Sequence, residues 1–304
     1  MTIAILISML AALVYSLTNY VDKFLVNGVN KIGSSIKTLL VFSTLIAGIV
    51  FSPIWLIING FNIIINIQSL VLILSSAIIS IVALYFYFKS LEISDTSIVV
   101  VMFQLIPVFS YIMGVIFFNE ILSIRQIVGS IIILCSTILI SIDFKTKSKK
   151  RLKVLPLMTI SSFLYALYYI LFELAIKNSS YNVCAFYFQI SLLVIGVFLL
   201  SLNSFRTAFI SAIKSNGKKY LSVNIINEFL NLAGMLLENY ANVLIPIAIV
   251  TVVSRVQVIF VFVIGLIGTI LFPKFFNENI SKDTVIKKIL CITLSIIGFA
   301  IAFL

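Results

Sequence analysis

Between residues 219 and 242, polar side chains recur every three or four positions in an otherwise apolar segment. On an α-helix this spacing places them on one face. If the helix crosses a bilayer, such a face must contact protein or water, and its carboxylates and amides suit a cation, a substrate ammonium group or a proton. A carboxylate near a helix end reaches the interface instead. The face comprises Asn224, Glu228, Asn231, Met235, Glu238 and Asn242.

One arginine, Arg255, lies within the next apolar segment. An unpaired guanidinium group at membrane depth is very costly, so it should meet a carboxylate of the protein or of a solute. In one interpretation Arg255 pairs with Glu228 or Glu238 and fixes packing. In the other, it holds an anionic group of the solute through its parallel N–H donors. Two amides in apolar segments, Gln257 and Gln104, are further candidates for substrate binding.

Tyrosines form a third group of candidates. Tyr165 and Tyr169 are one helical turn apart, and Glu173 follows one turn later. Tyr15 and Asn19 have the same spacing about 150 positions earlier. Tyrosine rings can surround an ammonium group, although tyrosines in membrane proteins also form belts at the interface. We expect Tyr165 and Tyr169, with Tyr15 and Asn19, to border a substrate site. The candidate proton or coupling residues are Glu228, Glu238 and Glu173.

The rest of the chain consists of elements that position these residues in a bilayer. Hydrophobic residues make up 62% of the 304 residues and charged residues only 10%. A membrane-spanning helix needs roughly 20 apolar residues, and ten such stretches occur. The sequence therefore predicts an all-α polytopic membrane protein with helices near 3–22, 36–58, 69–89, 96–118, 125–143, 154–176, 181–202, 219–242, 245–272 and 286–304.

Several kinds of chemistry are excluded by composition. The chain has no histidine, which rules out a Ser-His-Asp triad and paired zinc-binding histidines. Cys135, Cys184 and Cys291 lie inside apolar runs, as small buried residues do. No Gly-rich phosphate loop occurs. We therefore expect no enzymatic activity, no metal and no cofactor.

The net charge of +11 comes from basic residues between the apolar segments. The densest group, six residues between 145 and 153, is Lys145, Lys147, Lys149, Lys150, Arg151 and Lys153. Basic loops of this kind set the orientation of a membrane protein. They are not interpreted as a nucleic-acid site.

The two halves of the chain resemble each other. The segment 15–24 shares its pattern with 165–174, and the segment 118–123 recurs as 276–281. We predict a first five-helix repeat over residues 1–144, a basic loop over 145–153 and a second repeat over 154–304. Because five is odd, the second repeat enters the membrane inverted, as in many secondary transporters.

The first half resembles the EamA module of the drug/metabolite transporter superfamily. The resemblance rests on the small-residue turn within 83–98, Pro107, the acidic residue Glu120 and the helical glycine Gly129. It implies a ten-helix bundle around a central cavity that moves small metabolites without nucleotide hydrolysis.

The second half matches the same pattern with Glu278 and Gly298. It departs from it in helix nine, where Arg255 stands and the middle of the helix lacks a proline. We interpret Glu120 and Glu278 as helix caps or gate contacts rather than substrate ligands.

The expected function is a secondary active transporter or exchanger that moves a small polar metabolite, amino-acid-like or amine-bearing, across the cell membrane by alternating access. Its partners would be the solute, the lipid bilayer and a proton or counter-substrate, with the protein as a monomer or homodimer and no nucleic acid bound. Two alternatives stay open: a flippase for a lipid-linked carrier, and an accessory membrane subunit that does not transport.

Overall fold

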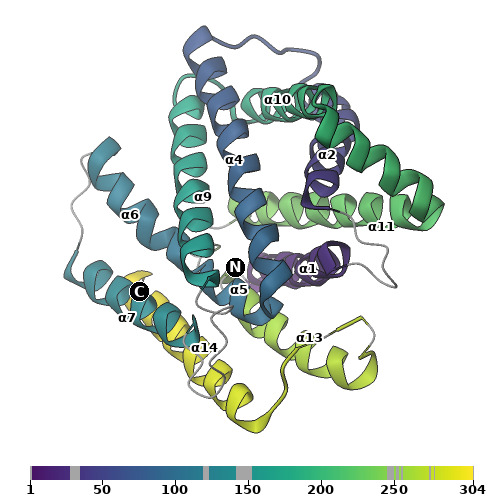
Figure 1. Ribbon diagram of the computed structural model, residues 1–304. Helices are drawn as coiled ribbons and strands as arrows, with labels where there is room; N and C mark the ends of the chain where they lie inside the picture. Colours follow the sequence, from purple (N-terminus) through teal and green to yellow (C-terminus); the bar gives the residue numbers. More distant parts are fainter. Residues whose placement is uncertain are drawn as a thin grey trace.

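The computed structural model describes residues 2–27, 35–118, 123–141, 153–244, 250, 253–254, 256–273, 275–276 and 278–303. Arg255, Glu120 and most of the basic loop, residues 145–152, lie outside these ranges. The part described is an assembly of helices (Figure 1). Its elements are α1 (Thr2–Asn27), α2 (Ile36–Ile46), η1 (Ala47–Phe51), α3 (Ser52–Ile58), α4 (Ile67–Ile93), α5 (Thr96–Met102), α6 (Leu105–Phe118), α7 (Ile124–Ser141), α9 (Val154–Ile176), α10 (Tyr181–Ser201), α11 (Asn203–Leu244), α13 (Gln257–Leu271) and α14 (Lys282–Phe303).

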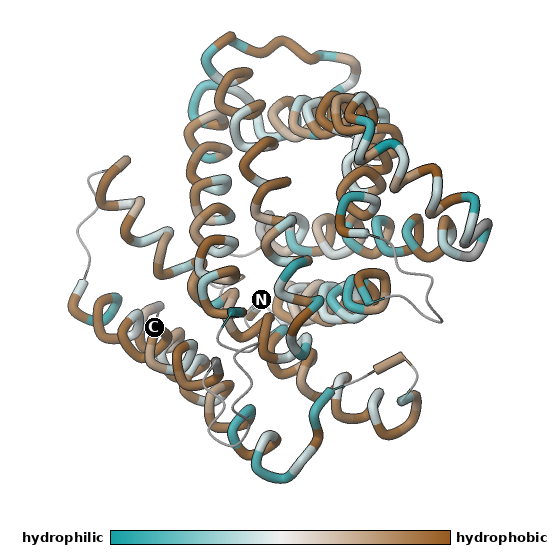
Figure 2. Tube along the Cα trace, viewed as in Figure 1, coloured by the Kyte–Doolittle hydropathy of each residue, from teal (hydrophilic) through white to brown (hydrophobic). Residues whose placement is uncertain are grey.

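Eight helical segments in the described ranges are long and apolar enough to cross a membrane. Two more apolar helices, Ile124–Ile140 and Gln257–Leu271, are shorter. Large apolar side chains are exposed on most of these helices, and brown prevails along them in Figure 2. Such surfaces suit acyl chains rather than water. The protein is therefore an integral, multi-pass membrane protein, while the count of ten crossings stays a prediction.

Two proline-containing crossings are irregular. In the second, a π-helical turn, η1, separates α2 from α3, which has Pro53 in its first turn. In the fourth, α5 ends at Met102 and α6 begins at Leu105. Because Pro107 has no N–H to donate to the carbonyl group of Phe103, that oxygen accepts from the Ile106 N–H at 3.0 Å instead. Proline thus explains why each crossing is built from two pieces.

The closest helix pairs join the two halves of the chain. α1 packs along α11, and α9 packs along α4, which lies beside it in Figure 1. If the crossings are numbered along the chain, α1 and α11 are the first and eighth, and α9 and α4 are the sixth and third. Exchanging the corresponding helices of the two five-helix halves turns the first into the sixth and the eighth into the third, so it converts one pair into the other. Two repeats related by a two-fold axis would give this exchange. The observation supports the inverted repeat, which remains a prediction.

The α7–α14 pair has close backbone contact. A Cβ atom added to Gly129 would meet the carbonyl oxygen of Gly298 and lie 2.7 Å from Cβ of Ala302. Further along, the hydroxyl groups of Ser136 and Ser295 are 2.5 Å apart. Small residues let helices approach closely in a membrane, where the hydrophobic effect does not drive association. The two glycines singled out by the EamA-like pattern therefore lie at one helix crossing.

Candidate functional site

A buried polar network lies where α1, α4 and α11 meet. Asp22 of α1 is 7% exposed, and its Oδ1 accepts a hydrogen bond from Asn227 Nδ2 at 2.7 Å. The hydroxyl oxygen of Tyr87 lies 3.0 Å from Asp22 Oδ2 and 2.9 Å from Asn19 Oδ1. The predicted substrate residue Asn19 is thus part of this network. One turn of helix separates Asn19 from Asp22, so α1 presents both on one face.

Glu228 lies beside this network. Its carboxylate accepts a 2.5 Å hydrogen bond from Ser43 Oγ of α2 and another from the Asn231 side chain. Glu228 is 8% exposed, and it is close enough to Asp22 for their charges to interact. The predicted pair Glu228 and Asn231 is therefore in contact, and Glu228 is buried between helices.

Glu238 forms a third contact between α1 and α11. Tyr15 donates a hydrogen bond to Glu238 Oε2 at 3.4 Å, and Ser254 donates to Oε1 at 3.0 Å. Tyr15 also interacts electrostatically with Tyr169 and Tyr168 of α9. Of the predicted tyrosines, Tyr15 therefore contacts this carboxylate, and Tyr169, which is 50% exposed, lies near Tyr15.

Aromatic rings connect the network to α9. The Tyr87 ring lies 5.2 Å from Phe103, and Phe103 lies 5.8 Å from Tyr165, measured between centroids. Tyr165 is near enough to Asp22 for an electrostatic interaction. A carboxylate beside aromatic faces is the combination that binds ammonium groups.

Three amides of this region have a buried polar atom without a hydrogen-bond partner among the described residues. The atoms are Asn19 Nδ2, Asn227 Oδ1 and Gln104 Oε1. Buried polar groups are nearly always paired, so each of these invites a partner from outside this part of the chain. No group of three or more Asp, Glu, Cys or His side chains within the described ranges could hold a metal ion.

The remaining predicted residues are less closely tied to the network. The carbonyl group of Gln257 accepts from Ser16 Oγ at 3.2 Å, while its side chain is half-buried. Glu173 is exposed on α9, and no hydrogen bond between described residues joins it to the network. Asn224 donates to the carbonyl group of Tyr220 within α11. Arg255 and the side chain of Asn242 lie outside the description.

A second polar cluster, the edge cluster, lies near the start of α14. Lys288 is 3% exposed, and its Nζ lies 2.6 Å from Glu278 Oε2 and 2.8 Å from Asp95 Oδ2. Glu278 also accepts from Ser97 Oγ at 2.6 Å, and the hydroxyl oxygen of Tyr20 lies 3.2 Å from its Oε1. The predicted role of Glu278 as a gate contact fits a residue that ties together α1, α5 and α14.

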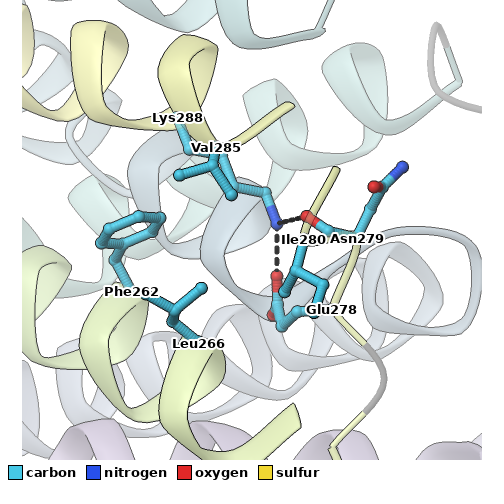
Figure 3. A pocket seen from close by; sticks show the side chains of 7 residues that line it. All are labelled: Phe262, Leu266, Glu278, Asn279, Ile280, Val285 and Lys288. Atoms are coloured by element: carbon cyan, nitrogen blue, oxygen red, sulfur yellow. Dashed lines mark hydrogen bonds and ion pairs between the residues drawn. The ribbon is translucent and has the colours of Figure 1, made fainter. Parts of the chain in front are cut away.

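A cavity of about 10 Å³ lies beside the Lys288–Glu278 ion pair (Figure 3). That volume holds about one water molecule. The dashed lines in Figure 3 join Lys288 to Glu278 and to the carbonyl group of Asn279. The cluster is thus closely packed, with no room for a metabolite.

The site residues predicted from the sequence do not include Asp22, Tyr87, Asn227 or Ser43. Asp22 lies at the end of the predicted helix 3–22, where the apolar run ends, but α1 continues to Asn27. The spacing of Tyr15, Asn19 and Asp22 at intervals of three and four was the available signal. Asn227 was overlooked because it lies beside the predicted stripe, on the part of α11 that turns toward α1.

These features define the protein as a multi-pass membrane protein with ionisable side chains held inside the bundle. Such residues at membrane depth mark pathways for ions or solutes. The sequence model of the EamA-like transporter family matches residues 2–142. The N-terminal half is thus an EamA-like module of the drug/metabolite transporter superfamily, as its motifs predicted.

Two further comparisons add little. No curated protein matches the chain. A crystal structure of another protein aligns over 99% of this chain and 95% of its own length, with 11% sequence identity and a TM-score of 0.49.

Proposed function

We propose that the protein is a secondary transporter or exchanger that moves a small amine-bearing metabolite, such as an amino-acid-like solute, across the cell membrane. The observation that carries this proposal is the grouping of Asp22, Glu228 and Glu238 beside tyrosines. In the described part of the chain, the hydrogen-bond partners of these three carboxyl groups are all neutral side chains. A positively charged solute would supply the missing countercharge.

The solute's ammonium group would lie near Glu228, with aromatic faces from Tyr165, Tyr169 and Tyr15 around it. Arg255, with Gln257 and Gln104, would serve the other end of an amino-acid-like solute by binding its carboxylate. Glu238 and Glu173 stay candidates for coupling to a proton or a counter-substrate.

Alternating access would arise from movement of one five-helix repeat against the other. The α1–α11 and α4–α9 pairs both join the proposed repeats, 1–144 and 154–304. Relative movement of the repeats would therefore act directly on the network, because Asp22 and Asn227 come from different repeats. Either proton-coupled transport or exchange fits this arrangement.

The test is a thermal-shift screen of the purified protein in detergent against amino acids, amines, choline, nucleotide sugars and phosphorylated metabolites. A ligand that binds only the folded state raises the apparent Tm. We expect an amine-bearing compound to raise it, Glu228→Gln and Tyr165→Phe to abolish the shift, and Arg255→Ala to abolish it for amino acids only.

The matched control is Glu92→Gln, which neutralises an exposed carboxylate at the end of α4 and should keep the shift. Stabilisation by phosphorylated compounds alone would contradict the amine proposal. No shift with any solute would favour a flippase or an accessory subunit.

A further inference from the structure

The hydroxyl group of Tyr87 has one proton and two oxygen atoms within donating distance. Those atoms are Asn19 Oδ1 at 2.9 Å and Asp22 Oδ2 at 3.0 Å. An amide carbonyl oxygen and an ionised carboxylate only accept hydrogen bonds, so the single phenol proton leaves one of them without a donor. Tyr87 is 3% exposed and Asp22 is 7% exposed, and a lost hydrogen bond at such a depth is costly.

With the Asn19 amide in the orientation seen here, in which Oδ1 faces Tyr87, a proton on Asp22 resolves this conflict. Asp22 Oδ2–H then donates to the hydroxyl oxygen of Tyr87, and Tyr87 donates to Asn19 Oδ1. Asp22 Oδ1 still accepts from Asn227 at 2.7 Å. We propose that Asp22 is a proton-binding site, occupied in this conformation, and that its proton is the coupling ion of transport. The inference deepens the proposed transport function and rests on it.

The charged and titratable groups around Asp22 agree with a neutral acid. Glu228 of α11 interacts electrostatically with Asp22, and Tyr87 and Tyr165 face Asp22 from α4 and α9. The described parts of α5 and α13 contribute no titratable side chain. Lys23, the next residue along α1, donates to the carbonyl groups of Leu91 and Ser94, and Tyr20 donates to the carbonyl group of Val261 at 2.7 Å.

Glu228 has the opposite surroundings. Ser43 donates to it at 2.5 Å, and the Asn231 amide is its second partner. Two hydrogen-bond donors on one carboxylate favour its ionised form. The two neighbouring acids therefore hold one proton and one negative charge between them, with the proton on Asp22. This avoids two adjacent buried anions.

Two amide atoms without hydrogen-bond partners support a site that binds and releases a proton rather than one that only packs helices together. Asn227 binds Asp22 through Nδ2, yet its Oδ1 has no partner in the described part of the chain, and neither has Asn19 Nδ2. Asn227 is 3% exposed. Both amides can rearrange their hydrogen bonds when the proton leaves. If Asp22 loses its proton, rotation of the Asn19 amide lets Nδ2 donate to Tyr87, and Tyr87 then donates to Asp22.

Release follows from the position of Asp22 between the two proposed repeats. If α1 and α11 part, Asn227 leaves Asp22 and water reaches the carboxyl group. The O–H bond of Asp22 then breaks, its electron pair stays on the carboxylate oxygen, and the proton passes to water on the open side. Binding from the other side returns a proton to the same oxygen.

Infrared spectroscopy of the protein in liposomes tests this without a known solute. A protonated carboxylic acid has a C=O stretch separate from the carboxylate and amide bands. We expect such a band in the wild-type protein, its loss in Asp22→Asn, and its persistence in Glu92→Gln and Glu228→Gln. Asp22→Glu should keep a band at a shifted position, which covers the case in which Asp22→Asn fails to fold.

Two results would overturn the proposal. An unchanged band in Asp22→Asn would show that Asp22 is ionised, and loss of the band in Glu228→Gln alone would place the proton there. The experiment requires no transport. Failure here therefore leaves the amine-transport proposal standing, and failure of the thermal-shift screen leaves the protonation of Asp22 unaffected.

Discussion

The network around Asp22 and Glu228, called the central network below, and the edge cluster each contain two carboxyl groups, yet only the edge cluster contains a cation in the part of the chain described. In the edge cluster, Lys288 lies within 2.8 Å of both Glu278 and Asp95. In the central network, the hydrogen-bond partners of Asp22 and Glu228 are neutral side chains. A fully paired cluster holds helices together, whereas a site that awaits a cation can bind and release one.

Removing the cation of the edge cluster should have the largest effect on stability. Lys288→Met leaves Glu278 and Asp95 without their countercharge, and breaking a buried ion pair in this way costs about 3–5 kcal/mol. We expect a lower apparent Tm and a lower denaturant midpoint in detergent. Lys282→Met, at an exposed position of α14, is the control. Equal stability of the two variants would show that Lys288 has no structural role.

A steric change at the α7–α14 crossing should have the next largest effect on stability. In Gly129→Ala, the new Cβ meets the carbonyl oxygen of Gly298 and Cβ of Ala302. Overpacking of this kind costs about 1–3 kcal/mol. Ile131→Leu, at an exposed position of the same helix, should be silent. The measurement is the free energy of unfolding in detergent, and no loss in Gly129→Ala would mean that the two helices separate easily.

The sequence predicted the crossings well but the contacts between them poorly. The predicted helices 36–58 and 154–176 coincide with the segments Ile36–Ile58 and Val154–Ile176. Hydrophobic length determines these bounds, and it can be read locally. Contacts between helices cannot be read locally. Helical spacing places Glu228 and Asn231 on one face, but it does not show that Ser43 of another helix reaches Glu228.

The same limit explains Asp22. A charged residue at the end of an apolar run resembles a loop residue, and only packing against α4 and α11 shows that it is buried. The EamA-like motifs were informative because they describe helix crossings and turns, which are properties of the fold. They do not specify which side chains fill the centre.

Tyr87→Phe tests how much the hydrogen bonds of the central network contribute to stability. The change removes the only O–H group near Asn19 Oδ1 and Asp22 Oδ2 in the described structure, and the lost hydrogen bond costs about 1–2 kcal/mol. Tyr187→Phe, which removes one hydrogen bond to the Ile63 carbonyl group, is the matched control and should cost less. If the control is the more destabilising of the two, the network does not depend on Tyr87.

The smallest effect is expected at Glu238. Glu238→Gln keeps an oxygen that can accept from Tyr15 or Ser254, and it removes a charge whose hydrogen bonds in the described structure come from neutral groups. We therefore expect a change in unfolding free energy below about 1 kcal/mol. Glu278→Gln makes the same chemical change beside Lys288 and should be clearly more destabilising, because a charged partner loses one of its two carboxylates. The ratio of these two losses in unfolding free energy measures how much less Glu238 contributes to stability than Glu278. A large loss in Glu238→Gln would indicate that a cation pairs with Glu238 in the resting protein, and Arg255 would then be the first residue to substitute alongside it.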